Sequence, residues 1–174
     1  MKLLIPLLLA VFMTGCSKPD LQSYAGHEPT LDLVAYFSGK TTGWGVVQDR
    51  KGTLIRQFVV SIDGTVNEDG ALVLDEQFVW SDGEESTRVW TIRKEGDGHF
   101  SGTAGDVAGT AVGTYAGNVV NWRYHLNIEA YGSTWKVHLD DWMFLNEDRV
   151  LINRAKMSKF GIHLGDITIA FSKD

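Results

Sequence analysis

Apolar and polar side chains alternate along residues 119–130, which is the period of a β-strand with one buried face. The parity switches after Tyr131-Gly132, and apolar residues then alternate with polar ones up to Leu145, except at Asp141 and Trp142. A turn at Tyr131-Gly132 therefore predicts a hairpin. Its opposing residues are expected to be Leu126 with Val137 and Ile128 with Trp135 on the buried face, and Arg123 with Asp140 and His125 with His138 on the other.

Short turn signals such as Asp63-Gly64 and Ser81-Asp82-Gly83 divide the rest of the chain into runs rich in β-branched and aromatic residues. Many antiparallel strands joined by short loops must stack as two sheets or close, and closure removes exposed edges. We therefore predict an all-β fold, an antiparallel up-and-down barrel of the lipocalin or calycin kind. The expected strands are residues 31–38, 43–49, 53–62, 71–80, 86–94, 99–105, 109–117, 119–130, 133–145, 149–158 and 162–172.

Glycines recur every fourth residue at Gly105, Gly109, Gly113 and Gly117. In a membrane helix this spacing would form a packing face. Polar residues within the run argue against a buried span, so strands are the favoured interpretation. The glycines would then share one face, where they leave space inside the barrel or let a strand bend.

Charged residues on the apolar faces of the predicted strands are the candidates for function. They are Arg56, Glu76, Arg88, Asp141 and Arg154, with one more positive than negative charge. An unpaired charge inside a barrel costs several kcal/mol, so these groups must meet each other, water or a ligand.

Two interpretations of these charges remain open. In the first, the five form a self-satisfied network, or some lie at strand ends in solvent. In the second, the arginines receive an anionic headgroup, because a guanidinium matches carboxylate or phosphate oxygens. Aromatic residues would then line the apolar part of a site for a fatty acid or phospholipid: Phe58, Trp80, Trp90, Trp122 and Tyr124.

The N-terminal residues have the features of a secretory leader. A basic Met1-Lys2 precedes an apolar run that ends at Met13-Thr14-Gly15-Cys16. This ending resembles the bacterial lipoprotein signal, which implies removal of residues 1–15 and acylation of Cys16, for instance with palmitate. The alternative is an ordinary cleaved leader with an incidental cysteine. Ser17 follows the cysteine where an Asp would retain a lipoprotein at the inner membrane, so we expect the periplasmic face of the outer membrane.

Residues 16–29 are expected to form the lipidated tether and residues 30–174 a single barrel domain. The full chain has 16 basic and 22 acidic side chains, a formal charge of −6. An acidic surface repels phosphate backbones, which makes nucleic acid an unfavourable partner. Membrane attachment would therefore depend on the acyl chains of Cys16.

Trp142 and Phe144 lie on the polar face of their predicted strand. We expect the N-terminal tether to cover them, and the alternative is an exposed docking patch. His125 opposite His138 could hold a metal, but two imidazoles without a third ligand favour no metal site.

Motifs of known catalytic chemistry are absent from the sequence. There is no Gly-x-Ser-x-Gly elbow, His-Glu-x-x-His helix, P-loop or dinucleotide fingerprint, and lipidation would consume the only cysteine. Asp140 and Asp141 are neighbours on a strand and point to opposite faces. An acid/base pair from separate strands, such as Glu76 with Asp141, stays open, but we predict no catalytic residues and no cofactor.

Several of these features together resemble an uncharacterised family of Gram-negative lipoproteins, known only as a domain of unknown function. They are the lipoprotein signal, Gly43-Trp44-Gly45 with Asp49-Arg50, the glycine-spaced middle, Asp140-Asp141-Trp142-Met143 and Asn153-Arg154. A weaker resemblance is to bacterial lipocalins, whose Gly-x-Trp signature is not met because Thr42 stands two residues before Trp44. That resemblance implies packing of Trp44 against Arg154 at one end of the barrel.

The leading hypothesis is a periplasmic lipoprotein that binds or carries a lipid-like amphiphile inside its barrel. A second is a structural or assembly lipoprotein with a side-chain-filled barrel that acts through its surface. A third is a lipid-modifying enzyme, which would need a carboxylate and an arginine to converge at a cavity wall. An apolar cavity that reaches Arg56 or Arg88 would favour the first hypothesis.

Overall fold

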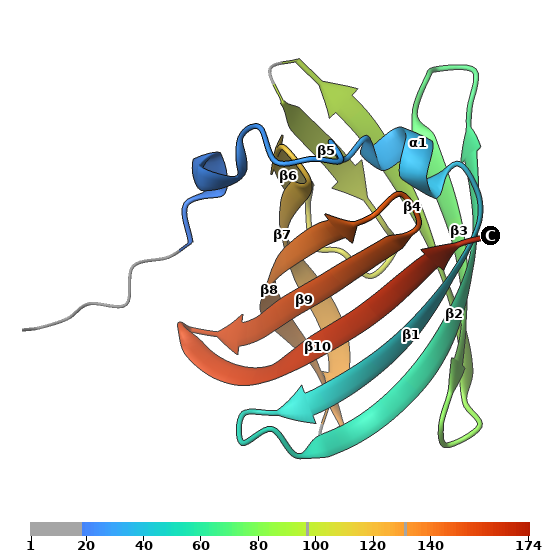
Figure 1. Cartoon of the computed structure of the whole chain (residues 1–174). Helices are drawn as coiled ribbons and strands as arrows, with labels where there is room; N and C mark the ends of the chain where they lie inside the picture. Colours follow the sequence, from blue (N-terminus) through green and yellow to red (C-terminus); the bar gives the residue numbers. More distant parts are fainter. Residues whose placement is uncertain (1–18, 97, 131) are drawn as a thin grey trace, which may run out of the picture.

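A computed structural model of the chain describes residues 19–174 except residues 97 and 131. The predicted signal peptide, Cys16 and Tyr131 lie outside the described residues. The described part forms ten antiparallel strands that close into a barrel in sequence order, with β1 beside β10, as predicted (Figure 1). The strands are β1 (Gly39–Asp49), β2 (Leu54–Val66), β3 (Leu72–Trp80), β4 (Glu85–Glu95), β5 (His99–Thr103), β6 (Ala111–Ala116), β7 (Val119–Ala130), β8 (Ser133–Asn146), β9 (Val150–Lys159) and β10 (Ile162–Lys173).

The β7–β8 hairpin has the predicted register. Leu126 pairs with Val137 and His125 with His138, and the remaining predicted pairs are also formed. Asp141 is buried on the inner face, as the alternation of β8 predicts. The register is well determined because a slip by one residue would turn every apolar side chain outwards.

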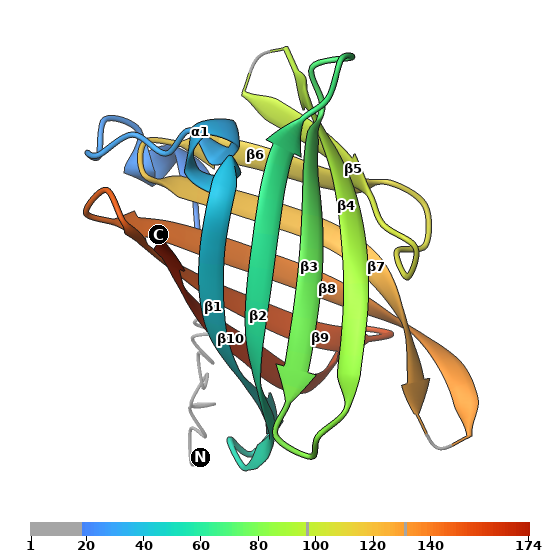
Figure 2. The same ribbon diagram turned by 90° about the vertical axis from the view of Figure 1, so that its right-hand side faces the viewer.

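The predicted strand at residues 31–38 is wrong. Leu33–Phe37 form a short helix, α1, and Oδ1 of Asp32 accepts a 3.0 Å hydrogen bond from the backbone N–H of Ala35. Leu33, Tyr36 and Phe37 are buried at the spacing of one helical face. The helix lies across one end of the barrel, above the start of β1 (Figure 2). The N-cap Asp32 and the helical spacing of the buried residues account for the helix at this position.

Only part of the glycine interpretation is correct. Gly105 and Gly109 belong to the connection between β5 and β6, and Gly117 lies in the following turn with φ +53°. Gly113 is on the inner face of β6, where an added Cβ would lie 2.2 Å from the Trp122 ring. Gly102 on β5 also faces this ring, and a Cβ added there would lie 2.7 Å from it. These two glycines provide the space that the indole occupies.

The N-terminal 3-10 helix η1 (Leu21–Tyr24) packs on the outside of the barrel against β6 and β7. The Tyr24 ring centroid lies 6.4 Å from that of Trp142 and 5.9 Å from that of Phe144. The expected covering of these two aromatic residues by the N-terminal segment is therefore present. Neither of the two helices in the described ranges has the length and hydrophobicity of a membrane span.

Candidate functional site

The barrel encloses a cavity of about 240 Å³. Its wall is mostly apolar, and Leu33 and Phe37 of α1 line it at one end. Residues of the β3 and β4 strand ends, including Trp80 and Ser86, line the other end. A cavity needs only ~10–15 Å³ to hold one water molecule, so this space is far larger than a packing defect. The barrel is consequently not filled by its own side chains.

A polar cluster lines this cavity, with one residue each from β3, β4, β7, β8 and the connection between β5 and β6. Glu76 on β3 and Arg88 on β4 are directly paired in the sheet, and Arg88 Nη1 lies 3.9 Å from Glu76 Oε2. Arg88 also binds Asp106 through Nε and Nη2, each 2.9 Å from Oδ2. On the β7–β8 hairpin, the Tyr124 hydroxyl donates a 3.2 Å hydrogen bond to Asp141 Oδ2. All five residues line the cavity.

Asp106 reaches the cluster because the segment between β5 and β6 folds over β7. Its backbone carbonyl accepts a 2.8 Å hydrogen bond from Asn127, and Ala108 donates one of 2.8 Å to the carbonyl of His125. Val107 forms an isolated bridge with Leu126 and is buried. The sequence analysis did not identify Asp106 as a cavity residue. The alternation of a strand predicts which side chains face inwards, but it says nothing about a residue in the segment between two strands. The only signal for Asp106 was an acidic residue within a glycine-rich apolar run.

The two buried carboxyl groups keep their protons to unusually high pH. Burial raises the pKa of Glu76 to about 7, an effect that Arg88 partly opposes and Asp106 reinforces. Burial likewise raises the pKa of Asp141 to about 7, against the hydrogen bond from Tyr124 and the charge of Arg88. Burial also raises the pKa of Tyr124 well above its usual value. Near neutral pH each buried carboxyl can therefore be neutral or charged.

Arg88 remains a cation in this environment. Burial opposes its charge, but Glu76, Tyr124 and Asp106 outweigh that effect and raise its pKa. Its side chain keeps 23% of its surface accessible although it lines the cavity wall. Arg88 is therefore placed to contact the contents of the cavity.

Several polar atoms of the cluster have no hydrogen-bond partner. They are Glu76 Oε2, whose nearest cation is Arg88 Nη1 at 3.9 Å, together with Asp106 Oδ1, Asp141 Oδ1 and the Nδ2 of Asn153 on β9. Asn153 still acts on Asp141 and lowers its pKa against the effect of burial, but the two side chains are not within good hydrogen-bond geometry. Buried polar groups are nearly always hydrogen-bonded in folded proteins. Such a concentration of unpaired atoms on one cavity wall is typical of a site that binds a polar group.

Aromatic rings form the wall next to the cluster. Trp90 contacts Trp122 edge to face at 5.8 Å between ring centroids, and Tyr124 in the same way at 5.4 Å. On the other side, the guanidinium of Arg88 lies 5.5 Å from the ring centroid of Phe78. The cluster thus lies within an aromatic enclosure, as expected for Trp90, Trp122 and Tyr124.

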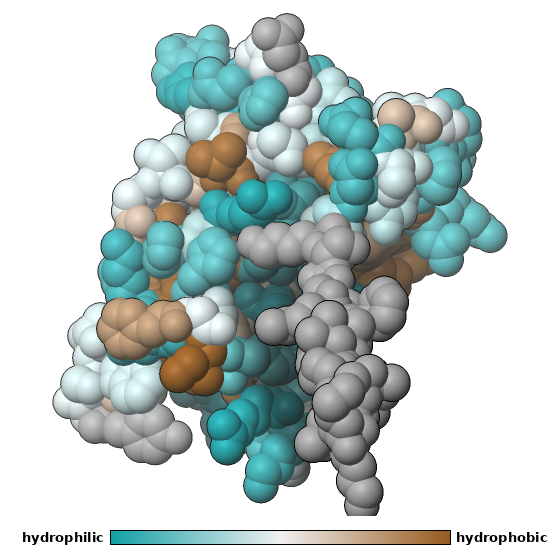
Figure 3. Space-filling view, turned by 90° about the vertical axis from the view of Figure 1, so that its left-hand side faces the viewer, coloured by the Kyte–Doolittle hydropathy of each residue, from teal (hydrophilic) through white to brown (hydrophobic). Residues whose placement is uncertain are grey.

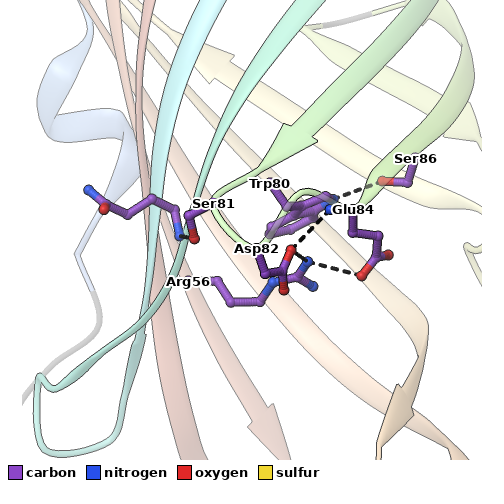
Figure 4. Close-up of polar contacts among 7 residues, drawn as sticks. Arg56, Trp80, Ser81, Asp82, Glu84 and Ser86 are labelled. Carbon is purple, nitrogen blue, oxygen red and sulfur yellow. Dashed lines mark hydrogen bonds and ion pairs between the residues drawn. The ribbon is translucent and has the colours of Figure 1, made fainter.

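Arg56 does not join this cluster. Its Nη2 binds Asp82 Oδ1 at 2.7 Å and Glu84 Oε2 at 3.0 Å in the β3–β4 turn, and its guanidinium lies 4.1 Å from the Trp80 ring centroid. Figure 4 shows these contacts, together with the bond from Trp80 to Ser86. Arg56 follows the inner-face parity of β2, but it lies at the strand end, outside the cavity lining. It corresponds to the expected alternative of a strand-end charge.

Arg154 was placed on the wrong face by the sequence. Leu151, Asn153 and Ala155 are the buried positions of β9, and Arg154 is exposed outside the barrel. Trp44, the expected partner of Arg154, is 52% exposed. Apolar Val150 and Ile152 had suggested an inner face, but they lie on the outer one with Arg154. Neither Arg154 nor the expected Trp44 plug contributes to the cavity.

His125 and His138 face each other on the outside of the β7–β8 hairpin, with ring centroids 5.2 Å apart. Burial, together with Lys136 and His138, lowers the pKa of His125. Over the described ranges, no three or more His, Cys, Asp or Glu side chains come together in a way that could hold a metal ion.

Comparison with solved structures identifies a similar barrel. The S-type phycobiliprotein lyase CPES from Guillardia theta has a TM-score of 0.61 and 8% sequence identity, and the match covers 81% of this chain and 90% of that one. At this identity the likeness concerns the fold alone, and it fits the predicted calycin-like architecture. No curated protein matches the chain. A family model, DUF3833, a protein family of unknown function, matches residues 10–173. The match spans nearly the whole sequence, and the chain therefore belongs to the DUF3833 family.

Proposed function

We propose that this protein is a lipoprotein of the periplasmic face of the outer membrane that binds or carries a lipid-like amphiphile inside its barrel. The observation that carries the proposal is the cavity of about 240 Å³ with apolar walls and one polar cluster. An apolar cavity with a few converging polar groups is the usual form of a small-molecule site. A polar head at the cluster and an apolar tail toward α1 would match this division.

The size of the cavity limits the ligand. Pockets for drug-sized molecules usually measure ~300–1,000 Å³, and this cavity, at about 240 Å³, lies just below that range. A single hydrocarbon chain suits such a space better than a phospholipid with two chains. Of the two ligand classes expected from the sequence, fatty acids and phospholipids, the cavity volume fits only the single-chain class.

The hypothesis of a side-chain-filled barrel that acts through its surface has less support. A filled barrel would not contain this cavity, and a docking surface usually presents a contiguous apolar patch. On the face seen in Figure 3, apolar residues form separate groups among polar ones. Elsewhere, the exposed residues Trp44, Val59 and Val79 are neighbours across β1, β2 and β3, so the cavity is the observation that separates the two hypotheses.

A lipid-modifying enzyme is a second candidate, because a carboxyl group and an arginine converge at one wall of the cavity, as such an enzyme would require. Glu76 and Asp141 have a raised pKa of about 7 and lie with Arg88 at one cavity wall. Conversion of a bound amphiphile to a product of different mass, lost in the Glu76→Gln variant, would establish this activity. Recovery of the amphiphile unchanged would favour a carrier.

Tryptophan fluorescence provides the test of binding, because Trp80, Trp90 and Trp122 all line the cavity. The delipidated protein is titrated with single-chain amphiphiles below their micelle concentration. The critical variant is Ala155→Phe, which fills the cavity from β9. The matched control is Ala170→Phe on β10, which lies opposite the outward-facing Trp44 in the sheet and outside the cavity lining. Saturable fluorescence changes in the wild type and the control, but not in Ala155→Phe, are expected. No response in the wild type would overturn the proposal.

The membrane anchor requires a separate experiment. In Gram-negative cells, we expect the wild type to incorporate labelled palmitate and to fractionate with the outer membrane. Cys16→Ala should abolish both properties, because no other cysteine is available for acylation. Labelling of the alanine variant, or fractionation of the wild type with the cytoplasm, would contradict the proposed anchoring.

A further inference from the structure

Acidic side chains outnumber basic ones in the cavity lining, whereas the sequence had predicted more basic side chains there. Arg56 and Arg154 lie outside the cavity lining, whereas the unexpected Asp106 belongs to it. Among the described residues, the charged groups of the lining are therefore Arg88 and three carboxyl groups: Glu76, Asp106 and Asp141. The cavity thus has an excess of acidic groups.

The one guanidinium is already engaged. Two nitrogen atoms of Arg88 contact Asp106 Oδ2 at 2.9 Å, and a third lies 3.9 Å from Glu76. An anionic headgroup would have to displace Asp106 and would then lie beside two further carboxyl groups. The geometry therefore disfavours the fatty acid carboxylate that counting arginines in the sequence had suggested.

Three of the four unpaired polar atoms in the cluster are carboxyl oxygens. Glu76 is 8% exposed and Asp141 is 6% exposed, and Glu76 Oε2 and Asp141 Oδ1 have no hydrogen-bond partner. A ligand that donates hydrogen bonds would satisfy these oxygens, and a positive charge would strengthen each bond. The acidic net charge of the chain, −6, also attracts cations to the molecule.

The aromatic wall suits the same ligand chemistry. Trp90 contacts Tyr124 of the cluster, with the two ring centroids 5.4 Å apart. The faces of aromatic rings attract ammonium groups, by ~0.5–2 kcal/mol depending on desolvation. An ammonium group at this end of the cavity would therefore meet carboxyl oxygens and ring faces, while its alkyl chain contacts the apolar wall.

We propose that the ligand is a single-chain amphiphile with a primary ammonium head, held by the carboxyl groups of Glu76 and Asp141. The inference rests on the proposed function and specifies the head group of its ligand. Asp106 remains the hydrogen-bonded partner of Arg88. Among the described residues, Glu76 has only the longer 3.9 Å contact with the same guanidinium, and Asp141 has no ion pair. The ligand charge is therefore balanced by the carboxyl charge of Glu76 and Asp141 that the single Arg88 does not neutralise.

Binding of this cation is coupled to protons. The groups that face Glu76 and Asp141 are Arg88, Asp106 and Tyr124, with Asp140 acting on Asp141 from the neighbouring position. In the free protein, burial raises the pKa of both carboxyl groups to about 7. An ammonium group stabilises their ionised forms, so binding releases protons to solvent. Affinity for an amine should consequently fall as the pH decreases below about 7, whereas affinity for an uncharged amphiphile should not.

Three amphiphiles with the same chain separate the possibilities: dodecylamine, dodecanol and laurate. Each is titrated into the delipidated protein by tryptophan fluorescence and by calorimetry in buffers of different ionisation enthalpy. We expect dodecylamine to bind at least about tenfold more tightly than dodecanol, which corresponds to ~1.4 kcal/mol. We also expect laurate to bind most weakly and the heat of amine binding to depend on the buffer.

Variants with one carboxyl group removed give the residue-level test. Glu76→Gln and Asp141→Asn should each weaken dodecylamine binding about tenfold and dodecanol binding much less, because only the ammonium group gains from the carboxyl charge. Retained dodecanol binding also shows that the cavity is intact. Asp75→Asn is the matched control, because Asp75 is the exposed neighbour of Glu76 on β3. It should bind all three molecules as the wild type does.

Two results would overturn the inference on the head group while leaving the proposed function in place. One is tighter binding of laurate than of dodecylamine, and the other is unchanged dodecylamine affinity in both Glu76→Gln and Asp141→Asn. Failure of all three molecules to bind would contradict the proposed function itself, and the inference would fall with it.

Discussion

Arg88 binds Asp106 with two nitrogen atoms, its Nε and Nη2 each 2.9 Å from Asp106 Oδ2. This contact joins the connection between β5 and β6 to the inner face of β4. It also places a carboxylate between Arg88 and any anion that enters the cavity. The same ion pair therefore anchors a loop and determines the electrostatic character of the site.

Removing this ion pair should destabilise the fold. For Asp106→Asn we predict a decrease in the free energy of unfolding of ~1–3 kcal/mol, because a partly buried charged hydrogen bond is lost. The matched control is Asp69→Asn, whose ion pair with Arg93 is exposed, with 75% of the Asp69 side chain accessible; its expected cost is ~0–1 kcal/mol. Urea denaturation measures both. Equal effects of the two substitutions would show that the Arg88–Asp106 contact has no structural importance.

The pH dependence of stability should reflect the two buried carboxyl groups. Burial raises the pKa of Glu76 from 4.5 to about 7, so the folded protein retains a proton that the unfolded chain has lost. The resulting stabilisation is complete below pH 4.5 and is lost as the pH rises to about 7. Asp141 behaves in the same way between 3.8 and about 7.

We therefore predict that Glu76→Gln flattens the decrease in unfolding free energy over this pH range, as measured by urea denaturation at several pH values. Asp75→Asn should retain the slope of the wild type. An identical slope in Glu76→Gln and the wild type would mean that Glu76 ionises at its ordinary pKa.

Packing around Trp122 should depend on the absence of a side chain at Gly113. An added Cβ at Gly113 would lie 2.2 Å from the indole, so Gly113→Ala must displace this ring or the strand. Such overpacking typically costs ~1–3 kcal/mol. At Gly105 an added Cβ would have no atom within 4 Å, so Gly105→Ala is the control, with little expected change. Urea denaturation followed by tryptophan fluorescence measures both variants, and equal stability of the two would contradict the assigned packing.

The α1 end of the cavity should control the length of the bound chain. Phe37 is 4% exposed, lines the cavity and contacts Phe171 edge to face at 5.6 Å. Phe37→Ala should decrease the unfolding free energy by ~3–5 kcal/mol and lengthen the cavity. The affinity for a hexadecyl amphiphile should then rise relative to its dodecyl counterpart. Phe160→Ala, at a residue that is 93% exposed, is the control. An unchanged chain-length preference in Phe37→Ala would exclude α1 as the end of the site.

The β7–β8 hairpin shows what could be predicted from the sequence. Strict alternation over two long strands joined by a short turn permits only one register that buries all the apolar residues. The same alternation correctly placed Asp141 inside and Trp142 outside the barrel. The closed barrel followed because antiparallel strands in sequence order leave two edges that can pair with each other.

The errors in the sequence-based prediction arose where the type of a residue does not reveal whether it lies inside or outside the barrel, or in a strand or a helix cap. Val150 and Ile152 are apolar but face outwards on β9, so the face assigned to Arg154 was inverted. Residues 31–38 were predicted to be a strand, but Asp32 caps the helix α1 within this range. Asp106 lies in a connection whose path depends on contacts with β7, and these contacts are remote in the sequence. Because of these misplacements, the sequence predicted an excess of positive charge in the cavity, whereas the structure has an excess of acidic groups there.

Native mass spectrometry of the protein extracted from membranes shows whether the barrel holds a ligand in the cell. We expect the wild type and Ala170→Phe to carry one small amphiphile per chain and Ala155→Phe to carry none. A wild-type protein without any bound molecule, or an Ala155→Phe protein that retains the same molecule, would contradict the proposed function.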